Sequence, residues 1–201
     1  KVSLFTLGTM RATESLEKMY SIIKNAYYVG INHIETAPSY GDAESLIGNS
    51  IKKLEIEENI KEKNWVITTK VLPKGDFDFL KNNFKNSLKN LKRQKINNLA
   101  IHGLNLKQHL DWVLAGEGKK FISWIIEKEL VDQVGFSSHG SYSLIKEAIN
   151  CEVFNFCSLH LHYLDQSKIT LAEQAIKKGM GVLAISPADK GGRLYSPSDI
   201  L

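Results

Sequence analysis

The stretch WVITTKVLPKGDFDFLKNNFKNSLKNLKRQKINNLAIHG, residues 65–103, contains two short apolar runs separated by a longer segment. The runs at 65–71 and 97–103 predict buried strands, because their apolar residues are continuous rather than alternating. Between the runs, the apolar residues that recur at helical spacing are Leu80, Phe84, Leu88 and Leu91. This spacing predicts an amphipathic helix with its lysines on the solvated face. A strand, a helix and a second strand in this order predict a βαβ unit with parallel strands.

The same alternation runs through the rest of the chain. We expect further strands at 3–10, 31–37, 131–140, within 152–164 and at 181–187. We expect a first helix from an N-cap near Thr13 to Gly30 and a second at 42–54. A longer helical stretch runs from about 104 to 129, with a break at 115–119. Two more helices follow, one from the loop after 131–140 to about Ile149 and one at 170–179. Units of this kind, about 30 residues apart, predict an α/β fold and favour a TIM (β/α)₈ barrel. A doubly wound open sheet is the rival.

The length of the chain bounds this expectation. Complete barrels of this type run to about 250 residues, and they need eight strands. The chain has 201 residues and about seven strand-helix units. We therefore expect residues 1–201 to form a single barrel domain that is incomplete, with its C-terminal part missing.

Composition narrows the classes of function. The chain is 43% hydrophobic and 24% charged, with a net charge of +4, which is ordinary for a globular protein. The basic segment 81–95 lacks the aromatic or glycine-rich motifs of RNA-binding proteins, so we expect no nucleic-acid partner. No apolar run approaches the ~20 residues of a membrane span. The two cysteines, Cys151 and Cys157, form no metal-binding spacing, so we expect a reduced cytoplasmic protein without a metal site. The oligomeric state stays open.

Polar side chains stand where three consecutive predicted strands end. Glu35 ends the second strand and Tyr40 follows in its loop, Lys70 ends the third strand, and His102 ends the fourth. Catalytic residues of such barrels come from the C-terminal ends of the strands. We therefore expect these four side chains to meet in one pocket. The fifth predicted strand ends in polar residues as well, and we place His160 and His162 on the sixth.

This set of side chains has a chemical use. A phenol is a poor proton donor near neutrality, but an adjacent ammonium stabilises the phenolate and a carboxylate holds the ammonium in place. A histidine beside the phenol can orient a substrate carbonyl. Together they would protonate a carbonyl oxygen while a cofactor delivers hydride to the carbon. Two alternatives stay open: Glu35 and Lys70 form a merely structural ion pair, or Lys70 is a Schiff-base nucleophile.

These residues, in this order, resemble the aldo-keto reductase family. The matching segments are Glu35-Thr36-Ala37, Tyr40-Gly41, ITTKV at 67–71, LAIHG at 99–103, VGFSSHG at 134–140 and SPADKGG at 186–192. The segments are most similar to a bacterial subgroup, some members of which carry a C-terminal iron–sulfur extension. The resemblance implies an NADPH-dependent oxidoreductase that reduces an aldehyde or ketone to an alcohol. It makes Tyr40 the general acid, assisted by Lys70, His102 and Glu35.

The resemblance also implies a cofactor site. The residues that it assigns to NADPH are Ser137, Ser138, Ser158, Ser186, Pro187, Lys190, Gly191 and Gly192. NAD is the alternative, because the segment that selects the adenosine phosphate follows an eighth strand. Glu35 stands where the family usually has Asp, Ser158 where it has Gln, and Ile185 where it has an aromatic residue. The first two departures, together with the missing C-terminal part, support an alternative function, a non-catalytic or regulatory relative with impaired cofactor binding. The sequence does not name the carbonyl substrate.

Overall fold

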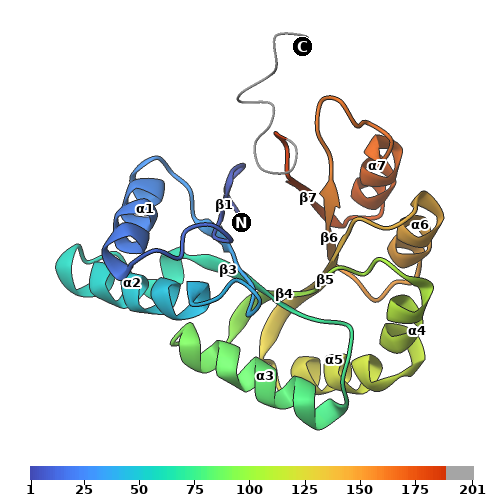
Figure 1. Cartoon of the computed structure of the whole chain (residues 1–201), viewed down its shortest axis with the longest axis horizontal. Helices are drawn as coiled ribbons and strands as arrows, with labels where there is room; N and C mark the ends of the chain where they lie inside the picture. The colour runs from blue at the N-terminus through green and yellow to red at the C-terminus, as the bar shows by residue number, and fades with distance from the viewer. Residues whose placement is uncertain (189–201) are drawn as a thin grey trace.

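The structure, a computed structural model, describes residues 1–188 of the chain. Strands and helices alternate along it (Figure 1). The strands are β1 (Thr6–Gly8), β2 (His33–Glu35), β3 (Val66–Val71), β4 (Ile96–Ile101), β5 (Val131–Ser138), β6 (Phe156–His160) and β7 (Gly181–Ile185). The helices are α1 (Leu16–Tyr28), α2 (Ala43–Glu57), α3 (Phe77–Asn90), α4 (Lys107–Ala115), α5 (Glu117–Glu127), α6 (Tyr142–Asn150) and α7 (Ile169–Lys177). A short 3₁₀ helix, Glu62–Asn64, precedes β3.

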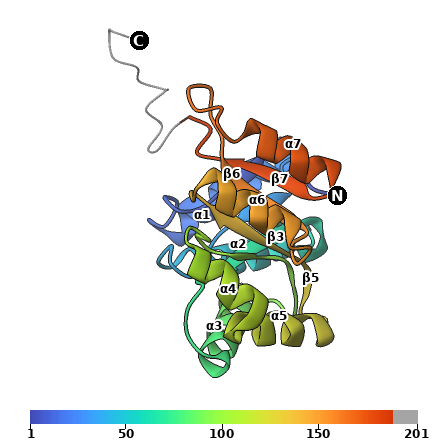
Figure 2. The ribbon, with the colours of Figure 1, turned by 90° about the vertical axis from the view of Figure 1, so that its right-hand side faces the viewer.

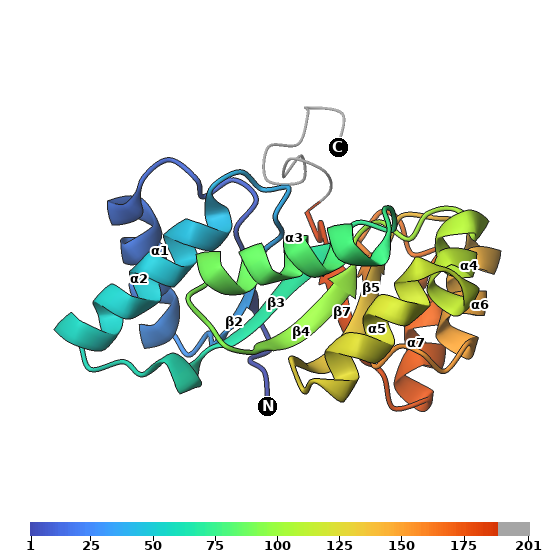
Figure 3. The ribbon, with the colours of Figure 1, turned by 90° about the horizontal axis from the view of Figure 1, so that it is seen from below.

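The strands form one parallel sheet in sequence order, from β1 to β7. The sheet curls into part of a barrel with its helices outside, and β1 and β7 stand on the two sides of the opening (Figure 1). Helices α4, α6 and α7 follow one another around the outer surface (Figure 2). Seen from below, α1 and α2 lie at one end and α4 to α7 at the other (Figure 3). This arrangement confirms the incomplete TIM-type barrel and is not a doubly wound sheet, in which the strand order reverses.

Several predicted boundaries were wrong by a few residues. Helix α1 begins after Ser15, not near Thr13, because the Ser15 hydroxyl accepts a hydrogen bond from the Lys18 backbone N–H at 3.1 Å. Strands β1 and β2 are three residues each, shorter than the runs 3–10 and 31–37. The break between α4 and α5 falls at Gly116, as predicted. His162 lies beyond the end of β6, in the loop that follows, and not on the strand.

The two faces of the sheet differ in character. Alternate residues point outward and are buried under the helices, and these include Ile34, Ile67, Leu99, Val134 and Cys157. The residues between them face the inside of the partial barrel and are largely polar. Glu35 and Lys70 lie on this inner face. Each is two residues further along its strand than His33 and Thr68, which belong to a row of hydrogen-bonded side chains. The inner face therefore carries the site.

That row of side chains crosses four strands. His33 lies between Thr6 and Thr68, and each of its ring nitrogens is 2.8 Å from a threonine hydroxyl oxygen. The side-chain amide of Asn98 donates to the same Thr68 hydroxyl at 3.0 Å. Burial, with a smaller contribution from the charge of Lys70, lowers the pKa of His33 to about 4. His33 is therefore a neutral structural member of the barrel interior.

Within residues 1–188, no helix combines the length and the apolar character needed to cross a bilayer. The longest of them, α2, has 15 residues, whereas a membrane-spanning helix needs about 20.

Candidate active site

Lys70 is the centre of the candidate site. Its side chain is only 2% exposed, and its ammonium Nζ lies 2.8 Å from Glu35 Oε1. The same nitrogen donates hydrogen bonds to Tyr40 Oη and to the Thr36 carbonyl oxygen, both at 3.0 Å. An ammonium has three N–H donors, and these three oxygens use all of them. A buried lysine is stable as a cation only when it is paired in this way.

Tyr40 is held beside Lys70 by the turn between β2 and α2. The Tyr40 backbone N–H donates to the Ala37 carbonyl at 3.0 Å, and its own carbonyl accepts from the Ala43 N–H at 3.2 Å. Gly41 follows with φ +59°, a left-handed conformation that glycine adopts without strain and that turns the chain into α2. Because the phenol oxygen accepts from Lys70, the phenolic proton remains available to another acceptor.

His102 completes the group from the first position after β4. Its backbone N–H donates to the Val71 carbonyl at 2.7 Å, which ties it to the end of β3. Its ring meets that of Tyr40 edge to face, with centroids 5.8 Å apart, and its Nδ1 lies 3.4 Å from the Ser39 hydroxyl. Burial, followed by the charges of Lys70 and His139, lowers the pKa of His102 to about 4. At neutral pH it is an uncharged imidazole that can donate a single hydrogen bond.

A pocket of ≈ 240 Å³ opens beside these residues. Lys70 and His102 supply polar groups in its wall, and most of the remaining lining is apolar. The other lining residues are Pro38, Ser39, Val71, Leu72, Phe79, Leu80 and Asn83. Pockets for drug-sized ligands are usually 300–1,000 Å³, so this one suits a small molecule with an apolar body and one polar end.

The serines at the end of β5 support the loops around the site. Ser137 Oγ accepts from the Gly103 N–H at 3.0 Å, which leaves its own hydrogen to donate. The Ser138 hydroxyl donates to the Leu104 carbonyl at 2.6 Å and accepts from the Gly140 N–H at 2.9 Å. Both serines therefore fix the loop that carries His102. A cofactor role for either one stays a prediction.

Ser158 on β6 is different. It is fully buried and pairs in register with Ser137 on the inner face of the sheet. Its hydroxyl has no hydrogen-bond partner among the described residues. A buried hydroxyl without a partner costs free energy, so a ligand group that bonds to it is favoured here. This position therefore fits a polar group of a bound cofactor.

The rest of the predicted cofactor site lies after β7. Ser186 has φ +53°, a left-handed conformation that is uncommon for a residue with a side chain, and Pro187 beside it is exposed. Lys190, Gly191 and Gly192 lie outside the described residues.

The interpretation of the sequence missed two contacts, the Thr36 carbonyl on Lys70 and the Ser39 hydroxyl near His102. Thr36 belongs to the quoted segment Glu35-Thr36-Ala37, and Ser39 lies between that segment and Tyr40.

A parallel, curled sheet with its polar side chains gathered at the strand ends places the chain in the TIM-barrel class. The sequence profile described as "Aldo/keto reductase family" matches residues 5–196. The chain therefore belongs to the aldo/keto reductase family, as the resemblance of its segments predicted.

Individual relatives and solved structures are similar to this chain. An aldo-keto reductase of Strobilurus tenacellus is 24% identical over an alignment of 201 positions that covers 96% of this chain and 57% of the relative. An aldo-keto reductase of Bacillus halodurans, solved in its holo form, matches with a TM-score of 0.78 at 20% identity over 93% of this chain and 63% of its own. A Bombyx mori aldo-keto reductase in complex with NADP matches with a TM-score of 0.73 at 20% identity over 91% of this chain and 62% of its own. The chain thus spans a little over half the length of the curated relative.

Proposed function

We propose that this protein is an NADPH-dependent oxidoreductase that reduces a small aldehyde or ketone to an alcohol. The observation that carries the proposal is the position of Lys70 Nζ, 2.8 Å from the Glu35 carboxylate and 3.0 Å from the Tyr40 phenol. This arrangement suits a phenol that gives up its proton and becomes negatively charged beside a fixed positive charge. The cytoplasm is the proposed location, on the basis of the free thiols of Cys151 and Cys157.

We place the proton transfer at the Tyr40 phenol, which contacts Lys70 at 3.0 Å and whose ring meets that of His102. A substrate in the pocket beside Lys70 and His102 has its carbonyl oxygen at the polar end of the cavity. Tyr40 donates its phenolic proton to that oxygen, and the ammonium of Lys70 stabilises the phenolate that remains. Neutral His102 donates a hydrogen bond that orients the same oxygen. Bound NADPH supplies the hydride that reduces the carbonyl carbon.

The residues present on β5 and β6 fit a nicotinamide cofactor. The buried Ser158 hydroxyl has no partner among the described residues, and Ser137 next to it retains a donor hydrogen. An amide offers both an acceptor and donors to such hydroxyls. NADP is proposed over NAD because the solved Bombyx mori relative is a complex with NADP.

The geometry bears on the two alternatives from the sequence. Glu35 was one reason to consider a non-catalytic relative, but the longer side chain still contacts Lys70 at 2.8 Å. Lys70 as a Schiff-base nucleophile is disfavoured, because an ammonium paired with a carboxylate has no lone pair to attack a carbonyl. An acid–base role in carbonyl reduction is the better account of this lysine.

Replacement of Tyr40 by Phe tests the proposal. We expect Tyr40→Phe to lower NADPH-dependent aldehyde reduction at least about 100-fold, since general acid catalysis is worth about 10²–10⁴. The NADPH dissociation constant, measured by fluorescence titration, should stay within about twofold. Tyr142→Phe is the matched control, because its hydroxyl lies 3.2 Å from the Thr170 hydroxyl and neither residue lines the pocket. Turnover retained in Tyr40→Phe would refute the role of the phenol.

A further inference from the structure

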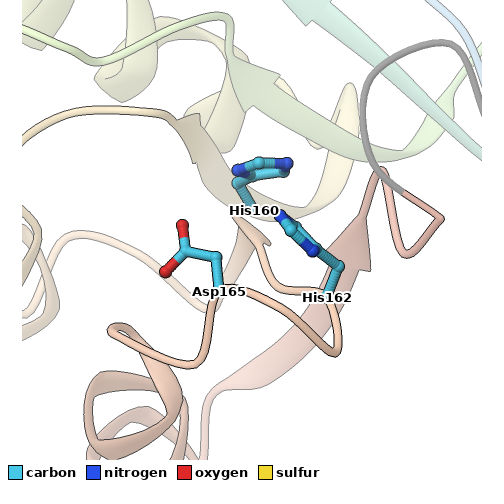
Figure 4. Close-up of side chains that lie close together, drawn as sticks. All are labelled: His160, His162 and Asp165. Carbon is cyan, nitrogen blue, oxygen red and sulfur yellow. The ribbon is translucent and has the colours of Figure 1, made fainter. Parts of the chain in front are cut away.

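A second group of ligand-type side chains lies at the end of β6. His160 is the last residue of the strand, and His162 and Asp165 follow in the loop (Figure 4). One ring nitrogen from each histidine and one carboxylate oxygen all lie within 4.8 Å of one another. All three residues are partly buried. None of the three has a role in the proton transfer proposed above.

The loop holds the carboxylate in place. The Asp165 backbone N–H donates to the His162 carbonyl at 3.0 Å, which closes a tight turn with both side chains on it. Asp165 Oδ1 accepts from the Ser167 N–H at 3.1 Å and from the Ser167 hydroxyl at 2.6 Å. These bonds hold the Asp165 carboxylate in one orientation. They also leave Oδ2 for an ion, and such supporting hydrogen bonds are typical of metal ligands.

The two imidazoles are close enough to share an ion. Their ring centroids are 4.9 Å apart, and the rings are tilted by 54°. His162 Nδ1 accepts a long hydrogen bond, 3.3 Å, from the Leu164 N–H.

We propose that His160, His162 and Asp165 form a binding site for a divalent transition-metal ion, with zinc the ion best suited to these ligands. Two imidazoles and one carboxylate, with a water molecule in the fourth position, are an established zinc ligand set. Zinc bonds of about 2.0–2.2 Å place tetrahedral ligand atoms roughly 3.4 Å apart. The present atoms, at up to 4.8 Å, must close by at most about 1.4 Å. Two of the three ligands are on a loop, which can make this adjustment.

The sequence signal for this site is short. We expected no metal site because the cysteines have no ligand spacing. The segment HLHYLD, residues 160–165, instead places two histidines and an aspartate within six positions. This spacing alone is weak evidence for a metal site. The turn between His162 and Asp165 brings their side chains close together, which the spacing does not show.

The test uses the 201-residue chain without a histidine tag. Cobalt(II), a spectroscopic substitute for zinc, should give visible ligand-field bands at one equivalent, and zinc should abolish them. His162→Gln and Asp165→Asn should each weaken zinc binding, measured by calorimetry, at least about tenfold, as even loss of a supporting residue costs 10–100-fold. The matched controls are His109→Gln and Asp132→Asn, which remove the same group types elsewhere and should leave the affinity unchanged.

A measurement on the unmutated chain covers the case in which a variant fails to fold. Two-bond ¹H–¹⁵N spectra of the imidazole rings should show large shifts of His160 and His162 with zinc, while buried His33 stays unchanged. Shifts confined to other histidines would overturn the proposal. So would the absence of cobalt bands, or equal zinc affinity in the two ligand variants and the controls.

Discussion

Replacement of Glu35 by Gln should destabilise the protein more than any loss of an exposed ion pair. The change keeps the size of the side chain and removes its charge. Lys70, which is 2% exposed and 2.8 Å from the carboxylate, would then be a buried cation with only neutral oxygen partners, the Tyr40 phenol and the Thr36 carbonyl. Both remaining contacts still bind the ammonium, so the penalty is expected near the lower end of the usual range.

The magnitude follows from the burial of the pair. Removing one partner of a buried ion pair costs about 3–5 kcal/mol, because the other charge stays out of water without compensation. We expect about 3 kcal/mol for Glu35→Gln. Glu35→Asp keeps the charge at a shorter reach and should cost clearly less. The double variant Glu35→Gln with Lys70→Met removes both charges, so it should recover much of the loss.

Urea unfolding, followed by far-ultraviolet circular dichroism, measures these free energies. Asp132→Asn is the matched control, because Asp132 pairs with Lys95 at 2.6 Å while both side chains are 45% exposed. Pairs of this exposed kind contribute about 0–1 kcal/mol. A loss in Glu35→Gln no larger than in Asp132→Asn would refute the view that Lys70 is a buried cation held by Glu35.

Three further predictions rest on single features of the structure. The pKa of both His33 and His102 is lowered to about 4, whereas a histidine in the unfolded chain has a pKa of about 6.5. Between these two pH values the unfolded chain binds more protons than the folded chain, so the stability of the protein falls as the pH drops from about 6.5 toward 4. For the buried His33 alone, the difference in stability between pH 7.0 and 4.5 is about 2 kcal/mol, and urea unfolding at these two pH values measures it; equal stability at both would contradict it. In Gly48→Ala, a Cβ would overlap backbone atoms at the end of α3, whereas one at Gly8 meets nothing within 4 Å, so only the first change should lower the unfolding free energy, by about 1–3 kcal/mol. Ser158→Ala removes a hydroxyl without a described partner, so stability should hold while the NADPH dissociation constant rises about three- to tenfold, the value of one hydrogen bond; an unchanged constant would remove Ser158 from the proposed cofactor site.

The order of strands and helices was predictable because the pattern of apolar residues differs between the strand and the helix of each unit. Continuous apolar runs marked the strands, and the stripe from Leu80 to Leu91 marked α3. The ends of the elements were less predictable. Thr13 and Ser15 are both suitable N-caps, and only the hydrogen bond from the Lys18 N–H selects Ser15. Strands β1 and β2 are shorter than their apolar runs because only three residues of each align in the ladder.

The central part of the candidate site was also predictable, for a topological reason. Parallel strands bring their C-terminal ends to one edge, so residues that end β2, β3 and β4 must be neighbours. The contact of Lys70 with the Thr36 carbonyl could not be predicted, because it depends on the direction of a backbone group in a turn. The hydroxyl partners of Ser137 and Ser138 depend on a neighbouring loop, which no local pattern encodes.

Transfer of deuterium tests the central claim most directly. The chain would be incubated with a small aldehyde and NADPH that carries deuterium at the reactive C4 position, and the alcohol analysed by mass spectrometry. We predict deuterium in the alcohol formed by the unmodified protein and at least about 100-fold less labelled alcohol, in the same time, with Tyr40→Phe. No labelled alcohol from the unmodified protein, or equal labelling by both proteins, would contradict the assignment of Tyr40, Lys70, His102 and Glu35 as a carbonyl-reducing site.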